Sequence, residues 1–249
     1  MIAPAAYERC LAFVNSHAQT PNRNAVSTPQ VYAKHAVTIS RQTGCGAHAV
    51  AEMLASLLQT RAPRDMPPWT IFDRNLVEKV LADHHLPERL AKFMPEDRVP
   101  LLDDIMDELF GLHPSEWTMV RQTSETILQL AELGNVIILG RGSNIVTAKL
   151  PHVRHIRLIG SLERRRENME RIEGLSPKAA AERVQQEDLG RARYLKKHFD
   201  ADIENPLLYH LVINMDHVAV DQAAQLINDL VLTPHATTPA RAMSGDVSV

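Results

Sequence analysis

The chain of 249 residues is poor in aromatic side chains, cysteine and net charge, and each shortage excludes a class of function. Aromatic residues make up only 4% of the chain, which leaves few flat surfaces for stacking single-stranded bases. The formal net charge is −3, so no global field attracts nucleic acid or an anionic membrane. The cysteines, Cys10 and Cys45, form neither a disulfide framework nor a metal-ligand spacing. We therefore expect no bound structural metal and no nucleic-acid partner.

Long hydrophobic runs are also missing. No apolar stretch approaches the roughly 18 residues that a membrane span needs, and the N-terminus lacks the basic-then-apolar pattern of a signal peptide. We predict a cytoplasmic protein in a reducing compartment, with no membrane partner. Protein partners stay open.

Composition changes along the chain predict three segments. Residues 1–35 combine a short helix, on which Cys10, Leu11 and Val14 have helical spacing, with a flexible linker rich in Ser, Thr, Asn and Pro. Residues 36–232 form the folded domain. Residues 233–249 carry small residues without periodicity, which is typical of a disordered tail.

Short apolar runs alternate with amphipathic stretches through the central segment, which predicts an α/β fold with a parallel sheet and helices on both faces. The five predicted strands are 37–39, 69–72, 136–139, 155–159 and 211–213. The predicted helices lie around 50–58, 76–81, 119–133 and 218–230. We expect Met53 and Met119 on these helices to lie in the core.

Residues 162–200 differ from the rest of the domain because they are heavily charged and helix-prone. The arginines of this segment are Arg164, Arg165, Arg166, Arg171, Arg183, Arg191 and Arg193. Two interpretations stay open: a solvated helical pair held by its own ion pairs, or a basic lid that closes over an anion.

Residues after the strands are the candidates for ligand binding, since ligands of an open parallel sheet bind beyond its carboxyl ends. The first strand leads into 40–49, a glycine-containing turn before a helix that is able to bind an anion or to serve only as a packing turn. Asp73 and Arg74 follow the second strand, where Asp73 is a binding residue or a helix cap. Arg141, between two glycines, follows the third. Together these groups favour phosphoryl chemistry.

The order of these blocks resembles the cytidylate kinase-like family. The resemblance rests on Val37-Thr38-Ile39-Ser40-Arg41 with Gly44-Cys45-Gly46, on Phe72-Asp73-Arg74-Asn75, and on Gly134 to Asn144 with its Gly-Arg-Gly segment. It also includes Leu162 to Ser176 with Asp188, Arg191 and Arg193 beyond, and the closing Leu211-Val212-Ile213-Asn214.

The resemblance implies a P-loop nucleoside monophosphate kinase: a three-layer fold with a five-stranded parallel sheet and an arginine-rich helical lid. Such enzymes transfer the γ-phosphoryl group of ATP, with Mg²⁺, to CMP or dCMP. The implied phosphate-loop residues are Ser40, Thr43, Gly44, Cys45, Gly46, Ala47, His48 and Ala49. The implied acceptor-binding residues are Asp73, Arg74, Arg141 and Asp188. The implied catalytic cations are Arg41, Arg141, Arg165, Arg191 and Arg193.

The phosphate loop departs from the usual pattern. A P-loop reads G-x-x-x-x-G-K-[ST], whereas here Arg41 replaces the first Gly, Ala47 occupies the Lys position, and neither His48 nor Ala49 has a hydroxyl. Loss of one well-placed cation in phosphoryl transfer costs on the order of 10³-fold in rate. The alternative hypothesis is therefore a catalytically weak or inactive nucleotide-binding protein with a regulatory role. For Cys45, a small residue that fills a turn is favoured over a redox-sensitive thiol.

Overall fold

The computed structural model describes residues 8, 11–13, 15, 16, 34–63, 66–77, 90, 98–110 and 118–233. Within these residues the strands form one parallel sheet in the order β2-β3-β1-β4-β5. The strands are β1 (Ala36–Arg41), β2 (Thr70–Phe72), β3 (Val136–Leu139), β4 (Val153–Ile159) and β5 (Leu211–Asn214). Because β1 lies at the centre, the segment that follows it begins in the middle of the carboxyl edge.

The central strands β1 and β3 are mostly apolar, and they are buried because helices cover both sides of the sheet. Val37, Ile39, Ile137 and Ile138 are fully buried, and Val37 pairs in register with Ile137. Burial of each such side chain contributes about 1.5–3 kcal/mol relative to exposure. Branched apolar residues therefore predominate at these positions, and the buried Thr38 between Val37 and Ile39 bonds the His155 ring at 2.9 Å.

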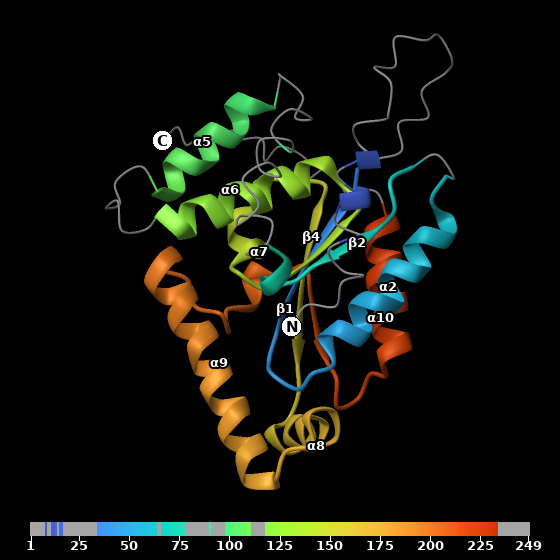
Figure 1. The fold of residues 1–249 in the computed structure, drawn as a ribbon, viewed down its shortest axis with the longest axis vertical. Coiled ribbons are helices and arrows are strands. Elements are labelled where there is room, and N and C mark those ends of the chain that lie inside the picture. The colour runs from blue at the N-terminus through green and yellow to red at the C-terminus, as the bar shows by residue number, and fades with distance from the viewer. Residues whose placement is uncertain are drawn as a thin grey trace, which may run out of the picture.

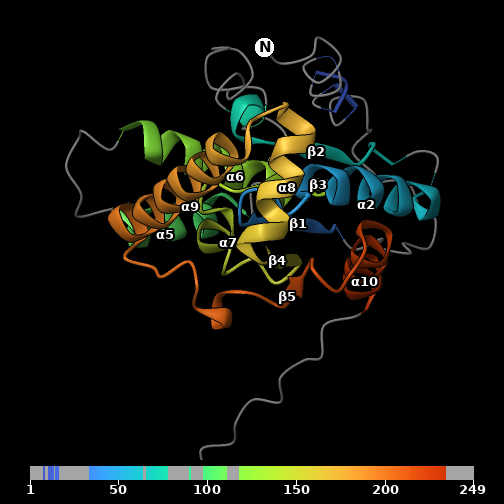
Figure 2. The ribbon, with the colours of Figure 1, turned by 90° about the horizontal axis from the view of Figure 1, so that it is seen from below.

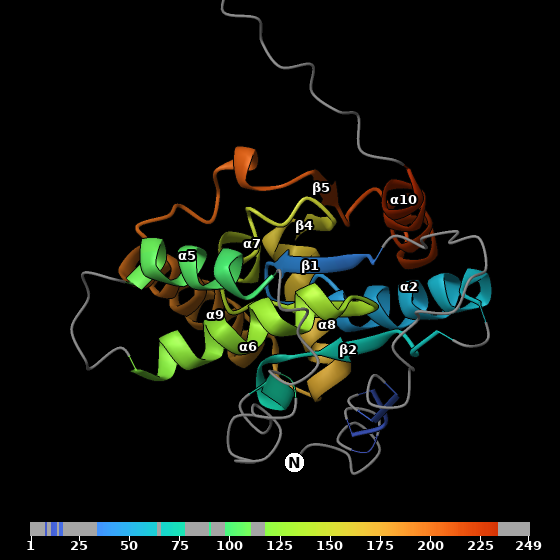
Figure 3. The ribbon, with the colours of Figure 1, turned by 90° about the horizontal axis from the view of Figure 1, so that it is seen from above.

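Two groups of helices enclose the sheet, one on each face (Figures 1 and 3). Helices α2 (Ala47–Arg61) and α10 (Val220–Leu232) contact each other and cover one face. The other face is covered by α6 (Thr118–Leu133) and the short α7 (Ser143–Val146), with α5 (Val99–Phe110) packed on α6. Each face has its own hydrophobic cluster, so the molecule has three layers.

The lid lies across the carboxyl edge of the sheet (Figure 2). It consists of α8 (Leu162–Glu173) and α9 (Pro177–Phe199), joined by a short turn that contains Gly174. The hydroxyls of Ser161 and Ser176 accept hydrogen bonds from main-chain N–H groups in the first turns of α8 and α9, so both helices begin at an N-cap. A short 3-10 helix, Pro206–Leu208, then precedes β5.

The five predicted strands and the parallel α/β sheet are confirmed. The predicted helices around 50–58, 119–133 and 218–230 correspond to α2, α6 and α10, and the charged segment is the helical pair of the lid. Residues 74–77 are helical, and the rest of the predicted helix over 76–81 lies outside the described residues. The predicted linker and tail lie almost wholly outside them as well. No described helix combines the length and apolarity of a membrane span.

Two core predictions are wrong. Met53 is 42% exposed and Met119 is 71% exposed. In α2 the buried stripe runs through Val50, Leu54 and Leu58, and Met53 falls at its solvent side. Met119 lies in the first turn of α6, before the helix reaches the core.

Two further contributions to the core were not predicted. Helix α5 buries Leu102, Ile105 and Met106 at helical spacing. Phe13, from the N-terminal segment, is fully buried and packs edge-to-face on Phe72 with ring centroids 5.6 Å apart. The hydrophobic cluster on the α6 face therefore extends to a residue that precedes the folded domain.

Candidate active site

The phosphate loop connects the central strand β1 to the N-terminus of α2. Gly44 and Gly46 both adopt left-handed backbone conformations, with φ of 85° and 73°. Gly46 is the N-cap of α2 and offers no side chain to its first turn. A Cβ at Gly44 would overlap the main-chain carbonyl of Arg165 in the lid. The glycines are thus required by the turn and by the close approach of α8.

Lid carboxylates bind this loop directly. The main-chain N–H of Thr43 donates to Asp188 Oδ1 at 2.7 Å, and the Thr43 hydroxyl donates to the same oxygen at 2.8 Å. The hydroxyl also lies 3.2 Å from Glu187 Oε2. The Asp188 carboxylate is an anion. It therefore accepts the hydrogen bond that the loop N–H of Thr43 is able to donate to a phosphate oxygen.

Lid arginines neutralise these carboxylates. Arg165 is 8% exposed and donates from Nη1 to Asp188 Oδ2 at 2.6 Å and to the Thr43 carbonyl at 3.2 Å. Arg191 donates to Asp188 Oδ1 at 3.1 Å, to Glu187 Oε2 at 2.8 Å, and to the Thr43 hydroxyl. The loop, α8 and α9 therefore form one ion-paired network.

The Gly-Arg-Gly segment turns the chain from β3 into α7 through three successive left-handed residues. Gly140, Arg141 and Gly142 have φ of 80°, 60° and 68°. A positive φ in a non-glycine residue is a strained conformation that clusters at functional sites. Here it directs Arg141 toward the lid, where its guanidinium carbon lies 5.7 Å from the ring centroid of Tyr194.

Both glycines of this segment also make room for neighbours. A Cβ at Gly140 would overlap the guanidinium of Arg41, and one at Gly142 would lie 2.6 Å from the ring of Phe199. The turn after β3 therefore brings Arg41 and Arg141 to the same wall of the site.

Arg41 is a desolvated cation. Burial, followed by the nearby charge of Arg191, lowers the pKa of its guanidinium to about 10. Glu187 and Asp73 act in the opposite direction. Arg41 stays protonated at neutral pH, and within the described residues its guanidinium has no hydrogen bond or ion pair. Such a group favours an anionic ligand.

A cavity of about 680 Å³ lies between the lid helix α9 and the carboxyl ends of β1, β2 and β3. Its walls come from the loop and strand ends and from one face of α9. The lining residues are Ser40, Arg41, His48, Asp73, Arg74, Asn75, Leu139, Gly140, Arg141, Gly142, Asn144, Arg183, Gln186, Glu187, Gly190, Arg191, Tyr194, Leu195 and Ile203. The volume is ordinary for a small-molecule site.

The structure brings part of the predicted set together in this cavity. The predicted residues that line it are Ser40, Arg41, His48, Asp73, Arg74, Arg141 and Arg191. The predicted residues outside its lining are Thr43, Gly44, Cys45, Gly46, Ala47, Ala49, Arg165, Asp188 and Arg193. Most of these residues outside the lining belong to the phosphate loop or to its ion-paired contact with α8 and α9.

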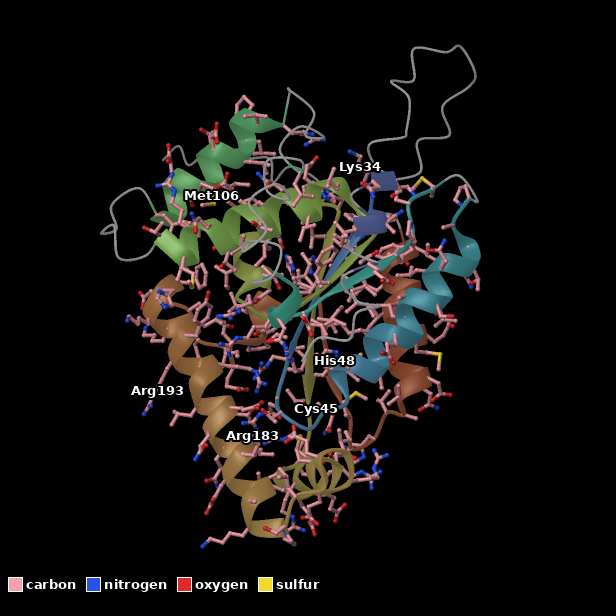
Figure 4. The ribbon with its side chains drawn as sticks, viewed as in Figure 1. Lys34, Cys45, His48, Met106, Arg183 and Arg193 are labelled. Carbon is pink, nitrogen blue, oxygen red and sulfur yellow. The ribbon has the colours of Figure 1, made fainter. Side chains whose placement is uncertain are left out.

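Helical periodicity separates Arg193 from Arg191. Successive residues of a helix are about 100° apart, so Arg193 lies roughly 200° around α9 from Arg191. Arg193 is exposed and points away from the cavity, whereas Arg183 lines it (Figure 4). The sequence argument missed Arg183, although its spacing of eight residues from Arg191 places both on one face.

Two other predicted residues have local partners. Asp73 Oδ1 accepts a hydrogen bond from the Leu76 N–H at 2.8 Å, so Asp73 caps the following turn and also lines the cavity. The Ser40 hydroxyl accepts from Arg157 Nη1 at 3.0 Å and lies 3.4 Å from the Tyr209 hydroxyl. This network holds the end of β1 against β4 and the segment before β5.

Cys45 is a packing residue of the loop. It is 3% exposed, and burial raises the pKa of its thiol to about 12. A thiol with this pKa forms almost no thiolate at neutral pH, so it is a poor nucleophile and a poor redox sensor. Among the described residues no group of three His, Cys, Asp or Glu side chains is placed to hold a metal ion.

Comparisons with known proteins agree with this architecture. A model of the cytidylate kinase-like family matches residues 36–217. A solved structure of an uncharacterized protein from Eubacterium ventriosum is similar, with a TM-score of 0.61 and 18% identity over 80% of this chain and 98% of that one. Shikimate kinase from Bacteroides thetaiotaomicron matches with a TM-score of 0.42 and 14% identity, over 80% and 99% of the two chains. No curated protein matches the chain significantly.

Proposed function

The chain belongs to the cytidylate kinase-like family, and we propose from this membership and from the cavity that it transfers the γ-phosphoryl group of ATP to CMP or dCMP. The observation that carries the proposal is the set of arginines on facing walls of one cavity. Arg41 and Arg141 lie on the strand-end wall, and Arg183 and Arg191 lie on α9. Four guanidinium groups supply the positive charge that the phosphate groups of two nucleotides need. The cavity volume of about 680 Å³ is far larger than a small inorganic anion needs.

The chemistry requires positioning and charge neutralisation. A guanidinium binds two phosphate oxygens through parallel N–H groups and offsets the negative charge of the transferring group. Arg41, desolvated beside Arg141, interacts more strongly with such charge than an arginine in water would. No general base is needed, because the attacking phosphate oxygen of CMP is already ionised. The closed lid excludes water that would otherwise hydrolyse ATP.

In this proposal main-chain N–H groups of the loop bind the donor phosphates together with Arg41 and Arg191. The N-terminus of α2 directs uncapped N–H groups at the loop. Ala47 and Ala49 supply no cation and no hydroxyl. Mg²⁺ would therefore enter with ATP, as part of the substrate, with phosphate oxygens and water as its main ligands. The cationic charge that a P-loop Lys would supply comes in this proposal from Arg41 and Arg191.

The test is a coupled assay for ADP formation with ATP, Mg²⁺ and each of CMP, dCMP, UMP, AMP and GMP. We expect turnover that depends on CMP or dCMP and that falls at least 10²-fold in Arg141→Ala, by analogy with the loss of a cation in phosphoryl transfer. Arg61→Ala is the matched control, because Arg61 is exposed in the last turn of α2 and lies outside the cavity lining. No turnover above a blank with any acceptor would refute the kinase proposal.

A second candidate is a nucleotide-binding protein without phosphotransferase activity. The observation that favours it is the occupied loop: the Thr43 N–H already donates to the Asp188 carboxylate, and the side chains that usually bind donor phosphates are missing. This candidate predicts saturable binding of CMP or ATP by titration calorimetry without turnover. Absence of binding for every nucleotide would refute both candidates.

A further inference from the structure

Gly190 lies in the interior of α9, where glycine is the least favourable residue apart from proline. Two structural reasons usually account for glycine: a left-handed backbone, or a neighbour that leaves no room for a Cβ. Gly190 does not have a positive φ, and none of the described residues comes within 4 Å of the position that its Cβ would take. Packing within the described chain therefore does not require glycine here. Gly44 and Gly140 differ, because a Cβ at either would overlap another residue.

Gly190 does line the cavity. On the same face of α9, Arg183 and Glu187 precede it and Arg191 and Tyr194 follow it. These side chains project from the helix on both sides of Gly190, which has no side chain, so the main chain of α9 faces the cavity between them. The position of Gly190 on the cavity wall is flanked by the guanidinium groups of Arg183 and Arg191 and by the carboxylate of Glu187.

We propose that Gly190 is the point at which the bound acceptor nucleotide contacts the main chain of α9, and that its lack of a side chain sets the size of the acceptor that fits. The inference rests on the proposed function and names a specificity-determining residue for it. The phosphate of the acceptor faces the arginines, and its nucleoside ring lies against the Cα of Gly190. Any side chain at this position projects into the space that the ring occupies.

The proposal predicts that stability and acceptor binding change in opposite directions. Gly190→Ala removes a helix-destabilising residue without a clash, so the thermal midpoint rises by about 2 °C or more. The added methyl raises the KM for CMP about tenfold, the lower end of the effect of a mismatched methylene in a fitted site. Gly190→Leu also keeps a good helix former, but it raises the KM for CMP more than 100-fold. The KM for ATP changes less than that for CMP in both variants.

The experiment measures the thermal midpoint, the KM for each nucleotide, and CMP binding by titration calorimetry. Gln185→Leu is the matched control, because it places the same side chain at an exposed position of α9 outside the cavity lining. It leaves the KM for CMP within about twofold of the wild type.

Each outcome decides between the two proposals. A more stable Gly190→Leu variant that binds CMP as tightly as the wild type overturns the role of Gly190 and leaves the kinase proposal intact. A lower thermal midpoint for Gly190→Ala also overturns it, since the glycine would then have a structural reason. A wild-type chain that neither binds nor phosphorylates any nucleotide refutes the proposed function, and the role of Gly190 with it.

Discussion

The substitution Asp188→Asn tests whether the lid is held on the phosphate loop by one carboxylate. Asp188 accepts from the Thr43 N–H at 2.7 Å and from the Thr43 hydroxyl at 2.8 Å. It also accepts from Arg165 Nη1 at 2.6 Å and from Arg191 Nη1 at 3.1 Å. Asparagine keeps the shape of the side chain, but it removes the charge and turns one of the two acceptors into a donor. That donor then faces either the Thr43 N–H or the Arg165 guanidinium.

The magnitude follows from the kind of hydrogen bond that is lost. A bond to a charged group contributes about 1.5–3 kcal/mol and a neutral bond about 0.5–1.5 kcal/mol, so the charge is worth about 1 kcal/mol per bond. The Asp188 side chain is 26% exposed, so solvent screens part of the interaction. We count the bonds to Thr43 and Arg165 and expect Asp188→Asn to weaken the lid–loop contact by about 2 kcal/mol.

Hydrogen exchange of the Thr43 amide measures this contact directly. A loss of about 2 kcal/mol makes exchange through local opening of the lid about 30-fold faster. Glu182→Gln removes a charge at an exposed position of the same helix and is the matched control. Urea unfolding of both variants shows whether the loss is local or global. Exchange at Thr43 within threefold of the wild type, with unchanged stability, would refute the reasoning.

Three further predictions concern the loop, the core and α10. Gly44→Ala should destabilise the protein by about 2 kcal/mol or more, because its Cβ would overlap α8; Gly174→Ala, where φ is 66° but the space is open, should cost clearly less in thermal unfolding. Burial, and then the nearby His210, lower the pKa of His155 to about 3 from 6.5. As the pH falls below 6.5, His155 becomes protonated in the unfolded chain but not in the folded one. The free energy of unfolding is therefore unaffected by His155 above pH 6.5 and falls by about 2–3 kcal/mol by pH 4.5. Urea titrations of His155→Asn should show a smaller loss over the same pH range. Arg154→Met should cost about 2 kcal/mol and speed amide exchange at the end of α10, because Arg154 donates to carbonyls of that end at 3.3 Å and 3.1 Å; unchanged exchange there would contradict it.

Local patterns in the sequence were sufficient for the layers of the fold. The runs around Ile39, Ile137 and Ile156 are short and branched, which marks buried parallel strands wherever they occur. Helix α5 was missed although Leu102, Ile105 and Met106 show the same periodicity that identified α2. The signal for α5 is therefore present in the local sequence. Met53 was wrong for a different reason, since the stripe alone does not say how wide the buried face is.

Most of the predicted residues that line the cavity lie at or just after a strand end. Asp73 and Arg141 lie within two residues of the ends of β2 and β3, and parallel strands end at one edge of a sheet, so the sequence predicts that they lie close together. No comparable rule predicts which lid residues face the site, because the position of the lid depends on how far α9 extends over the edge of the sheet. Helical spacing places Arg183 and Arg193 on different faces of α9, and only the orientation of α9 decides which of these faces lines the cavity.

Local patterns were enough for most of the strands and helices and for the carboxyl edge where the candidate site lies, because these depend on residues within one strand or one helical turn of each other. Which residues become partners across the site follows only from the packing of the layers. Thr43 bonds Asp188 across 145 positions of the chain, and Arg41 lies against Gly140 only because β1 and β3 are neighbours in the sheet. Contacts of that kind depend on how the layers pack, and no local pattern carries that information.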